Sequence, residues 1–182
     1  PQGAWCESID DILEVMREGD IITHCFHAST CGILDNQGQI HRSVHEAMER
    51  GVIFDVGHGQ GSFSWRIAEQ ALTQGAVPQT ISSDLHFYNL NGPVFHLASV
   101  VTKFIHLGMG LDEAIARVTS IPARIILMSD KIGTLVTGAW GDAVIFELQK
   151  GEFQLVDSHG EVRKGRQNLV PVKVVKGGRI YR

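Results

Sequence analysis

The sequence has little of what membrane-bound, nucleic-acid-binding or disulfide-stabilised proteins need. No apolar run approaches the ~18 residues of a transmembrane helix. The net charge of −4 offers no basic surface to a nucleic acid. The three cysteines, Cys6, Cys25 and Cys31, are odd in number and form neither a CxxC pair nor a disulfide framework. We therefore expect no membrane and no nucleic-acid partner.

The first residues show neither the pattern of a signal peptide nor an initiator methionine, so no signal peptide is expected. The chain opens PQGAW, without the basic start and apolar core of a secretory signal. With so few cysteines, a reducing cytoplasm is the expected location. The missing methionine indicates processing or, more simply, a fragment of a longer chain. Hydrophobic residues make up 43% and charged residues 20% of the 182 positions, which is typical of one soluble domain or one and a part.

What the sequence does contain is a chemical side chain at the end of three successive apolar segments. His24, His58 and Asp84 each follow such a segment, at spacings of 34 and 26 residues. A β-strand with its crossover helix takes roughly 30 residues. The same edge of a parallel sheet therefore presents a reactive group three times. In a (β/α) barrel that edge is the C-terminal face, where active sites lie.

Periodicity and turn signals predict two kinds of structure along the chain. Helices are expected over residues 9–17, 43–50, 62–74, 92–107 and 111–119, with buried strands at 20–23, 52–56 and 80–84. Beyond residue 133 the sequence favours antiparallel strands, at 134–136, 143–146, 153–157 and 170–175, with turns at Lys150-Gly151 and at 176–178. We predict an α/β unit over 1–132 and a β unit over 133–182.

Each candidate site residue has a functional and a structural interpretation. His24 is predicted to bind a metal, although a lone buried histidine is more often structural. Asp84 is predicted to bind a metal and move a proton, although an N-cap at this position is common. His86 either contacts substrate or holds Asp84 in place. His58 lies between two glycines, so we expect little side-chain bulk to hide it. It either contacts substrate, polarises a carbonyl group or fixes the backbone. Gly59 is expected to allow close approach of the substrate.

The other histidines are interpreted as less informative. His41 and His45 have a spacing that can bind zinc on a helix, but the HExxH pattern is incomplete, so a solvated helix face is favoured. His96, His106 and His159 have no partners in the sequence and are expected at the surface.

Together these motifs resemble the C-terminal part of amidohydrolase-superfamily enzymes, and particularly the dihydroorotase-like or amidohydrolase/deacetylase metallohydrolases. The resemblance spans nearly the whole chain. It rests on GDIITHCF at 19–26, FDVGHG at 54–59 and ISSDLH at 81–86. Lys103-Phe104, GTL at 133–135, Gly138 and Asp142 add to it.

The resemblance implies a TIM-like (β/α)8 barrel, of which this chain supplies about strands six to eight, followed by strands of a small β-sandwich domain. It also implies two divalent metal ions, usually zinc. His24 would then bind the second metal, Asp84 would bind the first and act as general base and acid, and His58 would contact substrate. The family's His-x-His pair, bridging lysine and fifth-strand histidine are missing, and His27 stands where the family has Asn or a small residue. The chain is therefore expected to need the upstream half of the barrel.

The resulting hypothesis is a metal-dependent hydrolase of a cyclic amide or ureide, an N-acyl compound or a related ester. Metal-activated water would attack the carbonyl of this small-molecule substrate, and Asp84 would carry the proton to the leaving group. A purine-type deaminase on the same scaffold remains open, because substrate-binding loops decide between the two. A non-catalytic remnant also remains open. It would complete a barrel with a second chain, since three barrel strands leave two open sheet edges that could equally pair in a homo-oligomer.

Overall fold

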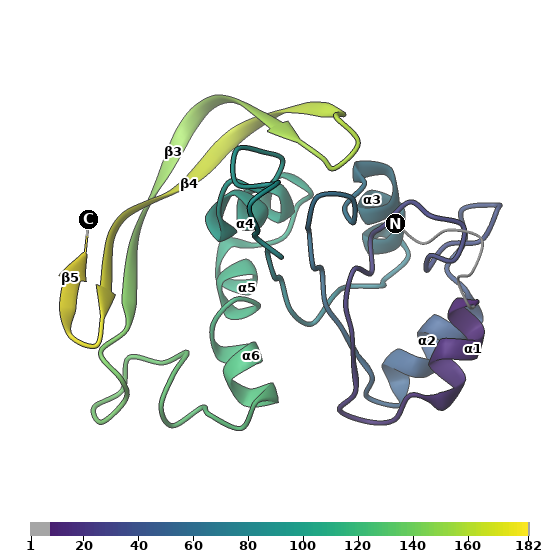
Figure 1. Cartoon of the computed structure of the whole chain (residues 1–182), viewed down its shortest axis with the longest axis horizontal. Coiled ribbons are helices and arrows are strands. Elements are labelled where there is room, and N and C mark those ends of the chain that lie inside the picture. The colour runs from purple at the N-terminus through teal and green to yellow at the C-terminus, as the bar shows by residue number, and fades with distance from the viewer. Residues whose placement is uncertain (1–7, 182) are drawn as a thin grey trace. The chain divides into compact units, whose positions relative to one another are not determined.

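The computed structural model describes residues 8–181, and the chain packs as two compact units (Figure 1). One unit runs as far as Phe95 and includes the short segment Val156–Glu161, and the other comprises the remaining residues from His96 onward. This division by packing lies elsewhere than the predicted boundary at 132/133, which follows the change from barrel-like to β-rich sequence. Cys6 lies outside the described residues. Within residues 8–181 no helix is long and apolar enough to cross a membrane.

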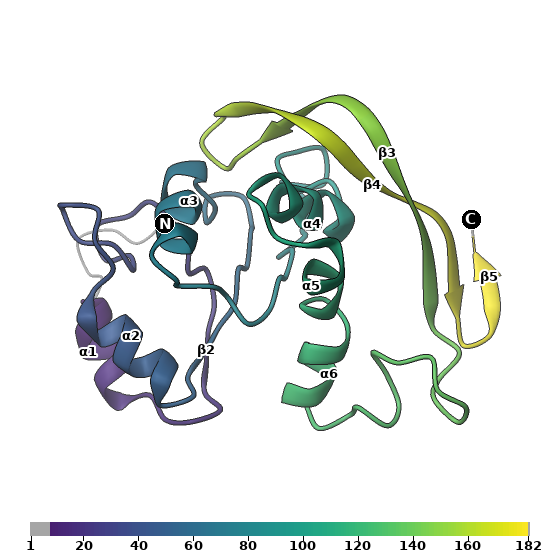
Figure 2. The same ribbon diagram turned by 180° about the vertical axis from the view of Figure 1, so that it is seen from behind.

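The first unit alternates helices with short parallel strands. Its elements are α1 (Ile9–Val15), β1 (Ile21–Ile22), α2 (Arg42–Glu49), β2 (Ile53–Phe54) and α3 (Trp65–Thr73). β1 pairs with β2 in parallel, and a further parallel bridge joins Asp55 to Thr80. The helices α1 and α2 lie side by side, and β2 leads through a turn into α3 (Figure 2). The predicted mixed α/β class is confirmed, whereas the assignment to barrel strands six to eight stays a prediction.

Local sequence explains where these elements begin and end. Ser8 accepts a hydrogen bond from the Asp11 N–H at 3.1 Å and caps α1, as predicted. Two acidic residues in the first turn of α1 complement the helix dipole. α3 begins at Trp65 rather than at residue 62, because Phe63 is still extended and bridges to Phe26. The side chains of Phe26, Phe63 and Trp65 are buried and form the part of the core next to the start of α3.

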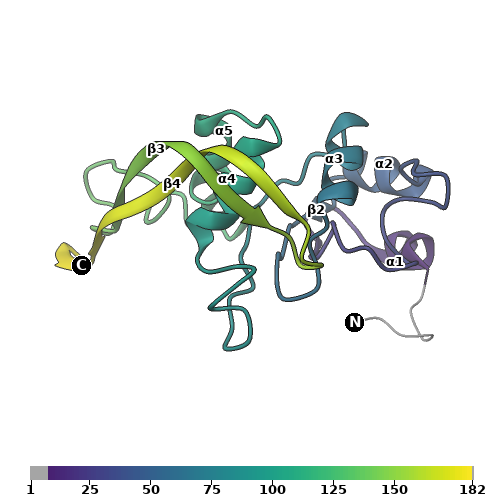
Figure 3. The same ribbon diagram turned by 90° about the horizontal axis from the view of Figure 1, so that it is seen from above.

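The second unit packs a helix against a long β-hairpin. It contains α4 (Leu97–His106), α5 (Leu111–Ala116), α6 (Ser120–Ile125), β3 (Ala143–Val156), β4 (Val162–Lys176) and β5 (Arg179–Tyr181). The strands form one sheet in the order β3-β4-β5. Figure 3 shows β4 passing over α4. There the hydroxyl of Thr102 accepts a hydrogen bond from the Leu169 N–H at 3.0 Å.

The hairpin is longer than the sequence predicts. Lys150 and Gly151 are predicted to form a turn, but this is wrong, because both lie within β3. The chain reverses instead after Asp157, whose carboxylate accepts hydrogen bonds from the backbone N–H groups of His159 and Glu161 at 2.8 and 2.9 Å. A side chain that satisfies the turn's own donors fixes the position of the reversal.

A second prediction for this region is also wrong, and a third is confirmed. Residues 134–136 are predicted as a strand but are irregular, and the Leu135 side chain is 84% exposed. An apolar run without a neighbouring strand has no partner for its backbone groups, so propensity alone does not make it a strand. The turn at 176–178 is confirmed, because it joins β4 to β5 with Lys176 opposite Arg179.

Candidate active site

The buried carboxylate of Asp55 ties together three strand ends. Its Oδ2 atom accepts hydrogen bonds from the hydroxyls of Thr23 at 2.7 Å and Ser82 at 2.6 Å, and its Oδ1 atom accepts one from Thr80 at 2.6 Å. Asp55 is only 8% exposed. Thr23 follows β1, Asp55 follows β2, and Thr80 and Ser82 belong to the third extended segment. The Asp55 side chain therefore holds together the sheet edge that is predicted to carry the site.

His24 follows Thr23 and is held in a defined orientation. Its Nδ1 atom lies 2.6 Å from the carbonyl oxygen of Gly57. Because a carbonyl oxygen only accepts hydrogen bonds, Nδ1 carries the proton and Nε2 keeps its lone pair. Histidines that bind metals commonly donate their other ring N–H to a backbone carbonyl in this way. The φ angle of His24 is 66°, a left-handed conformation held by its surroundings.

The turn Gly57-His58-Gly59, here called the glycine turn, separates His24 from Asp84. A Cβ atom added to Gly57 would lie 2.6 Å from the His24 Nδ1 atom, and one added to Gly59 would lie 2.6 Å from the Asp84 Oδ2 atom. Both glycines also have positive φ angles, 46° and 52°. Glycine is therefore required at both positions. His24 and Asp84 consequently pack against the same short turn, and their convergence on one metal centre stays a prediction.

Asp84 is itself positioned by the buried amide of Asn89. The Asn89 Nδ2 group donates to the carbonyl oxygen of Asp84, and Asn89 Oδ1 accepts from the His86 N–H, both at 2.9 Å. Asn89 has no exposed surface, whereas Asp84 and His86 are exposed. The ring of His86 packs edge-on against Tyr88, with centroids 5.9 Å apart. Asn89 thus holds the loop that carries both predicted site residues.

The expectation that the His58 ring is uncovered is wrong. The His58 side chain has no exposed surface and stacks on the Phe63 ring, with centroids 4.6 Å apart and planes 15° from parallel. Its Nδ1 atom lies 3.0 Å from the carbonyl oxygen of Gly59, to which it donates. The flanking glycines do not expose the ring, because the backbone directs it inward onto Phe63. This environment favours the backbone-fixing interpretation of His58 over substrate contact.

Two titratable neighbours of His24 have altered pKa values. Burial raises the pKa of the Cys25 thiol well above its usual range, and the negative charge of Asp55 adds to this effect. Burial also lowers the pKa of His27, and the nearby His24 lowers it further. The His27 Nδ1 atom accepts a hydrogen bond from the Ser29 N–H at 3.2 Å. At neutral pH both side chains are therefore uncharged.

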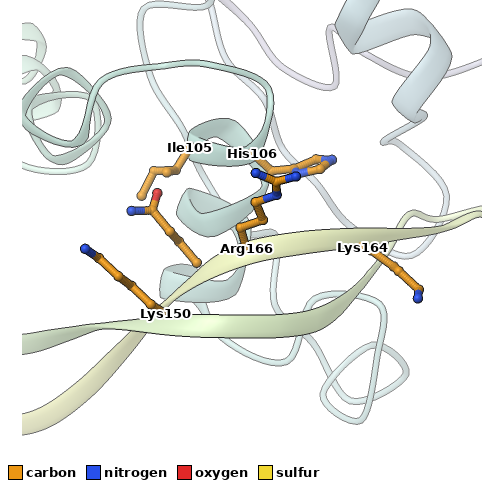
Figure 4. A pocket seen from close by; sticks show the side chains of 6 residues that line it. Ile105, His106, Lys150, Lys164 and Arg166 are labelled. Carbon is orange, nitrogen blue, oxygen red and sulfur yellow. The ribbon is translucent and has the colours of Figure 1, made fainter.

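A cavity of about 500 Å³ lies in the second unit, and none of the predicted site residues lines it (Figure 4). Its lining residues are Ile105, His106, Lys150, Lys164, Arg166 and Gln167. The side chains of Arg166 and His106 both line this cavity, and both are exposed. The candidate site is accordingly the sheet edge around the glycine turn.

Comparison with known proteins shows which enzymes the chain is similar to. The chain is 39% identical over 175 residues to a protein named deacetylase from Enterococcus faecalis, a match that covers 95% of this chain and 47% of that protein. A solved adenine deaminase structure has a TM-score of 0.93 and 38% identity, covering 98% of this chain and 49% of its own. The chain is thus similar to the C-terminal portion of amidohydrolase-superfamily enzymes. A solved dihydroorotase has a TM-score of 0.82 and 30% identity, covering 95% of this chain and 47% of its own.

The match to one family profile is confined to the C-terminal region of the chain. The profile described as "Deacetylase-like composite domain" matches residues 135–182. The chain spans about half the length of the relatives it matches.

The donor set of the chain fits part of a metal centre. Imidazole nitrogen and carboxylate oxygen are both zinc ligands, and a catalytic zinc ion takes three protein ligands. The fixed ring of His24 leaves Nε2 available as a donor, and the exposed Asp84 carboxylate adds oxygen. Across residues 8–181, no group of three or more His, Cys, Asp and Glu side chains is placed to hold a metal ion. His24 and Asp84 therefore fit a metal site as two of its ligands.

Two residues that organise this site, Asp55 and Asn89, are not among the site residues that the sequence predicts. Asp55 lies within the FDVGHG motif, and the signal was an acid inside an otherwise apolar strand. Such a residue needs partners wherever it is buried. Asn89 gave no comparable signal, because an Asn in a loop rich in Gly and Asn is ordinary turn composition.

Proposed function

We propose that this chain forms part of a metal-dependent hydrolase that cleaves C–N bonds in cyclic amides, ureides or N-acyl compounds, or the corresponding esters. The observation that carries the proposal is the packing of His24 and Asp84 against one glycine turn, with His24 Nδ1 bonded to the Gly57 carbonyl. The relatives named deacetylase and dihydroorotase support a C–N bond as the reacting group.

In the proposed mechanism each residue has one task. His24 would hold the second of two divalent cations through Nε2, Asp84 would hold the first through its carboxylate, and zinc is the first candidate for both. When bound, such ions polarise a carbonyl group and lower the pKa of water towards ~7. Asp84 would take the proton from the attacking water and return it to the leaving nitrogen. Gly59 would let the substrate approach the backbone, and His86, exposed two residues beyond Asp84, would contact its polar groups.

We further propose that upstream barrel strands, outside this sequence, supply the remaining ligands. Two candidate ligands fall short of the three that a catalytic zinc ion takes. The match to only about half of each relative supports this arrangement. The proposed architecture is a TIM-like barrel whose strands six to eight come from this chain, with residues 133–182 contributing strands to a small β-sandwich.

A purine-type deaminase is the second candidate, favoured by the 38% identity to a solved adenine deaminase. Both reactions use activated water, but they release different products. Deacetylation releases acetate, and adenine deamination releases ammonia. Assaying the protein that joins this chain to the upstream strands against N-acetyl amino acids, cyclic ureides and adenine separates the two. A well-folded protein that binds no metal and turns over none of these compounds would instead support the non-catalytic alternative.

The decisive variant is Asp84→Asn in that longer protein. The change keeps the shape of the side chain but removes the base and a charged ligand. We expect turnover to fall by about 10²–10⁴-fold, the usual contribution of general acid–base catalysis. Asp112→Asn, on the exposed start of α5, removes the same charge far from the turn in sequence and serves as the matched control. Activity of Asp84→Asn within about tenfold of the control would exclude Asp84 as the proton carrier.

A further inference from the structure

The tip of the β3–β4 hairpin, Val156–Glu161, packs within the first unit and contacts the glycine turn. The Ser158 hydroxyl lies 3.4 Å from the His58 carbonyl oxygen and 3.3 Å from the Gly59 carbonyl oxygen, so it donates between the two. The same hydroxyl accepts a hydrogen bond from the Phe63 N–H at 3.2 Å, and the Ser158 N–H donates to the Phe63 carbonyl at 3.0 Å. Ser158 thus links the turn to the segment that leads into α3.

Asp157 fixes the tip in place from the adjacent position. Its side chain is buried, and Oδ2 accepts a hydrogen bond from the Trp65 N–H at 3.2 Å. The N-cap residue of α3, Ser64, makes no side-chain capping bond of its own. Asp157 therefore supplies the cap from 92 positions away in the sequence. The Trp65 indole Nε1–H donates to the Glu161 carbonyl oxygen at 3.1 Å, which is a second hydrogen bond between Trp65 and the hairpin tip.

The glycine turn connects the hairpin tip to the two predicted metal ligands, His24 and Asp84. Gly57 accepts the His24 ring N–H, and Gly59 is in close contact with the Asp84 carboxylate. The His58 ring stacks on Phe63, which Ser158 bonds twice. A shift of the turn would therefore move the supports of both predicted ligands together.

We infer that the hairpin tip, through Ser158 and Asp157, holds the glycine turn in the conformation that positions His24 and Asp84 for the reaction. The inference rests on the proposed function for what is positioned. Ser158 and Asp157 are positioning residues, since they act through the turn and touch neither predicted ligand. The β3–β4 hairpin, which follows the barrel-like region in the sequence, therefore helps to hold the candidate active site in place.

Ser158→Ala tests the inference, because it removes the hydroxyl and leaves the backbone bond to Phe63. The first readout is amide hydrogen exchange at His58 and Gly59, whose N–H groups bond to the Ser82 and Ser83 carbonyls. The second is zinc affinity, measured by chelator competition in the longer protein. Removing a group that supports a metal ligand typically weakens metal binding by about 10–100-fold. We expect faster exchange at both amides, zinc affinity lower by that factor, and a fall in kcat with little change in KM.

Two further variants separate positioning from general stability. Ser158→Thr keeps a hydroxyl and should restore slow exchange and zinc affinity. His159→Ala alters an exposed side chain of the same turn and should leave both unchanged. If Ser158→Ala does not fold, Asp157→Asn, which keeps the side-chain shape but weakens the cap, should accelerate exchange at Trp65 and in the glycine turn.

The outcomes distinguish this inference from the proposed function. Wild-type exchange and zinc affinity in Ser158→Ala would overturn the positioning role, even in an active hydrolase. Equal damage from Ser158→Thr and Ser158→Ala would also overturn it, because the hydroxyl would then not be the cause. A wild-type protein that binds no zinc and has no hydrolase activity would refute the proposed function, while faster exchange in Ser158→Ala would still support the mechanical link.

Discussion

Replacing Asp55 should separate the strand ends that carry the candidate site. Its carboxylate accepts three hydroxyl hydrogen bonds at 2.6–2.7 Å, from Thr23, Thr80 and Ser82. A hydrogen bond to a charged group contributes about 1.5–3 kcal/mol. Thr23 is exposed and the other two are half-buried, so water can replace the lost acceptor and the lower value applies. We expect Asp55→Ala to lower the free energy of unfolding by about 4 kcal/mol and Asp55→Asn by about 2 kcal/mol.

Urea unfolding of Asp55→Ala, Thr80→Val and the double variant measures the network directly. A typical domain has a free energy of unfolding of about 5–15 kcal/mol, so the expected loss is large but measurable. Because Thr80→Val removes one partner of the same carboxylate, the double variant should lose less than the sum of the single losses. Asp112→Ala, an exposed acid, is the control and should change stability by less than about 0.5 kcal/mol. Additive losses, or a loss below about 1 kcal/mol in Asp55→Ala, would refute the reasoning.

Three further predictions test the neighbourhood of the turn. Gly59→Ala should destabilise the protein more than Gly75→Ala, because both have positive φ angles but only at Gly59 does the new methyl group meet Asp84; equal unfolding midpoints would contradict this. The pKa of His27 is lowered by burial, so the unfolded chain binds the extra proton, and the free energy of unfolding should fall as the pH drops below the ordinary value of 6.5. His27→Gln should weaken that pH dependence, and the part that remains is expected from His96, whose pKa burial also lowers. Burial raises the pKa of Cys25, so its alkylation at pH 8 should be much slower in the folded than in the urea-unfolded protein.

The sequence was sufficient for the features that depend on local spacing. The Ser8 cap, the alternation of helices with apolar segments and the strand-end positions of His24 and Asp84 follow from short patterns. These patterns work because the period of a helix or a strand repeats within a few residues. The parallel pairing of β1 with β2 agrees with the predicted succession of parallel strands. The third segment is extended, but only the bridge at Thr80 marks it as strand-like.

The features that failed are those that tertiary packing decides. The glycines beside His58 suggested an open ring, yet backbone direction turns the ring onto Phe63. Lys150-Gly151 has the composition of a turn, but strand pairing across the hairpin continues past it. In both cases a local preference worth a fraction of a kcal/mol is outweighed by burial of a large side chain or by a ladder of hydrogen bonds.

The spacing of residues in the sequence does not predict which residues hold the candidate site in place, and the reason is physical. Ser158 lies 100 positions from His58, and Asp157 lies 92 positions from Trp65. Closing a loop of that length costs conformational entropy, and the hydrogen bonds of Ser158 and Asp157 alone do not offset that cost. The rest of the hairpin packs against α4 and offsets this cost, and the Ser158 hydroxyl at its tip donates to the glycine turn. Reactive groups are thus recognisable from the strands that carry them, whereas the residues that orient those groups depend on where the whole fold brings distant segments.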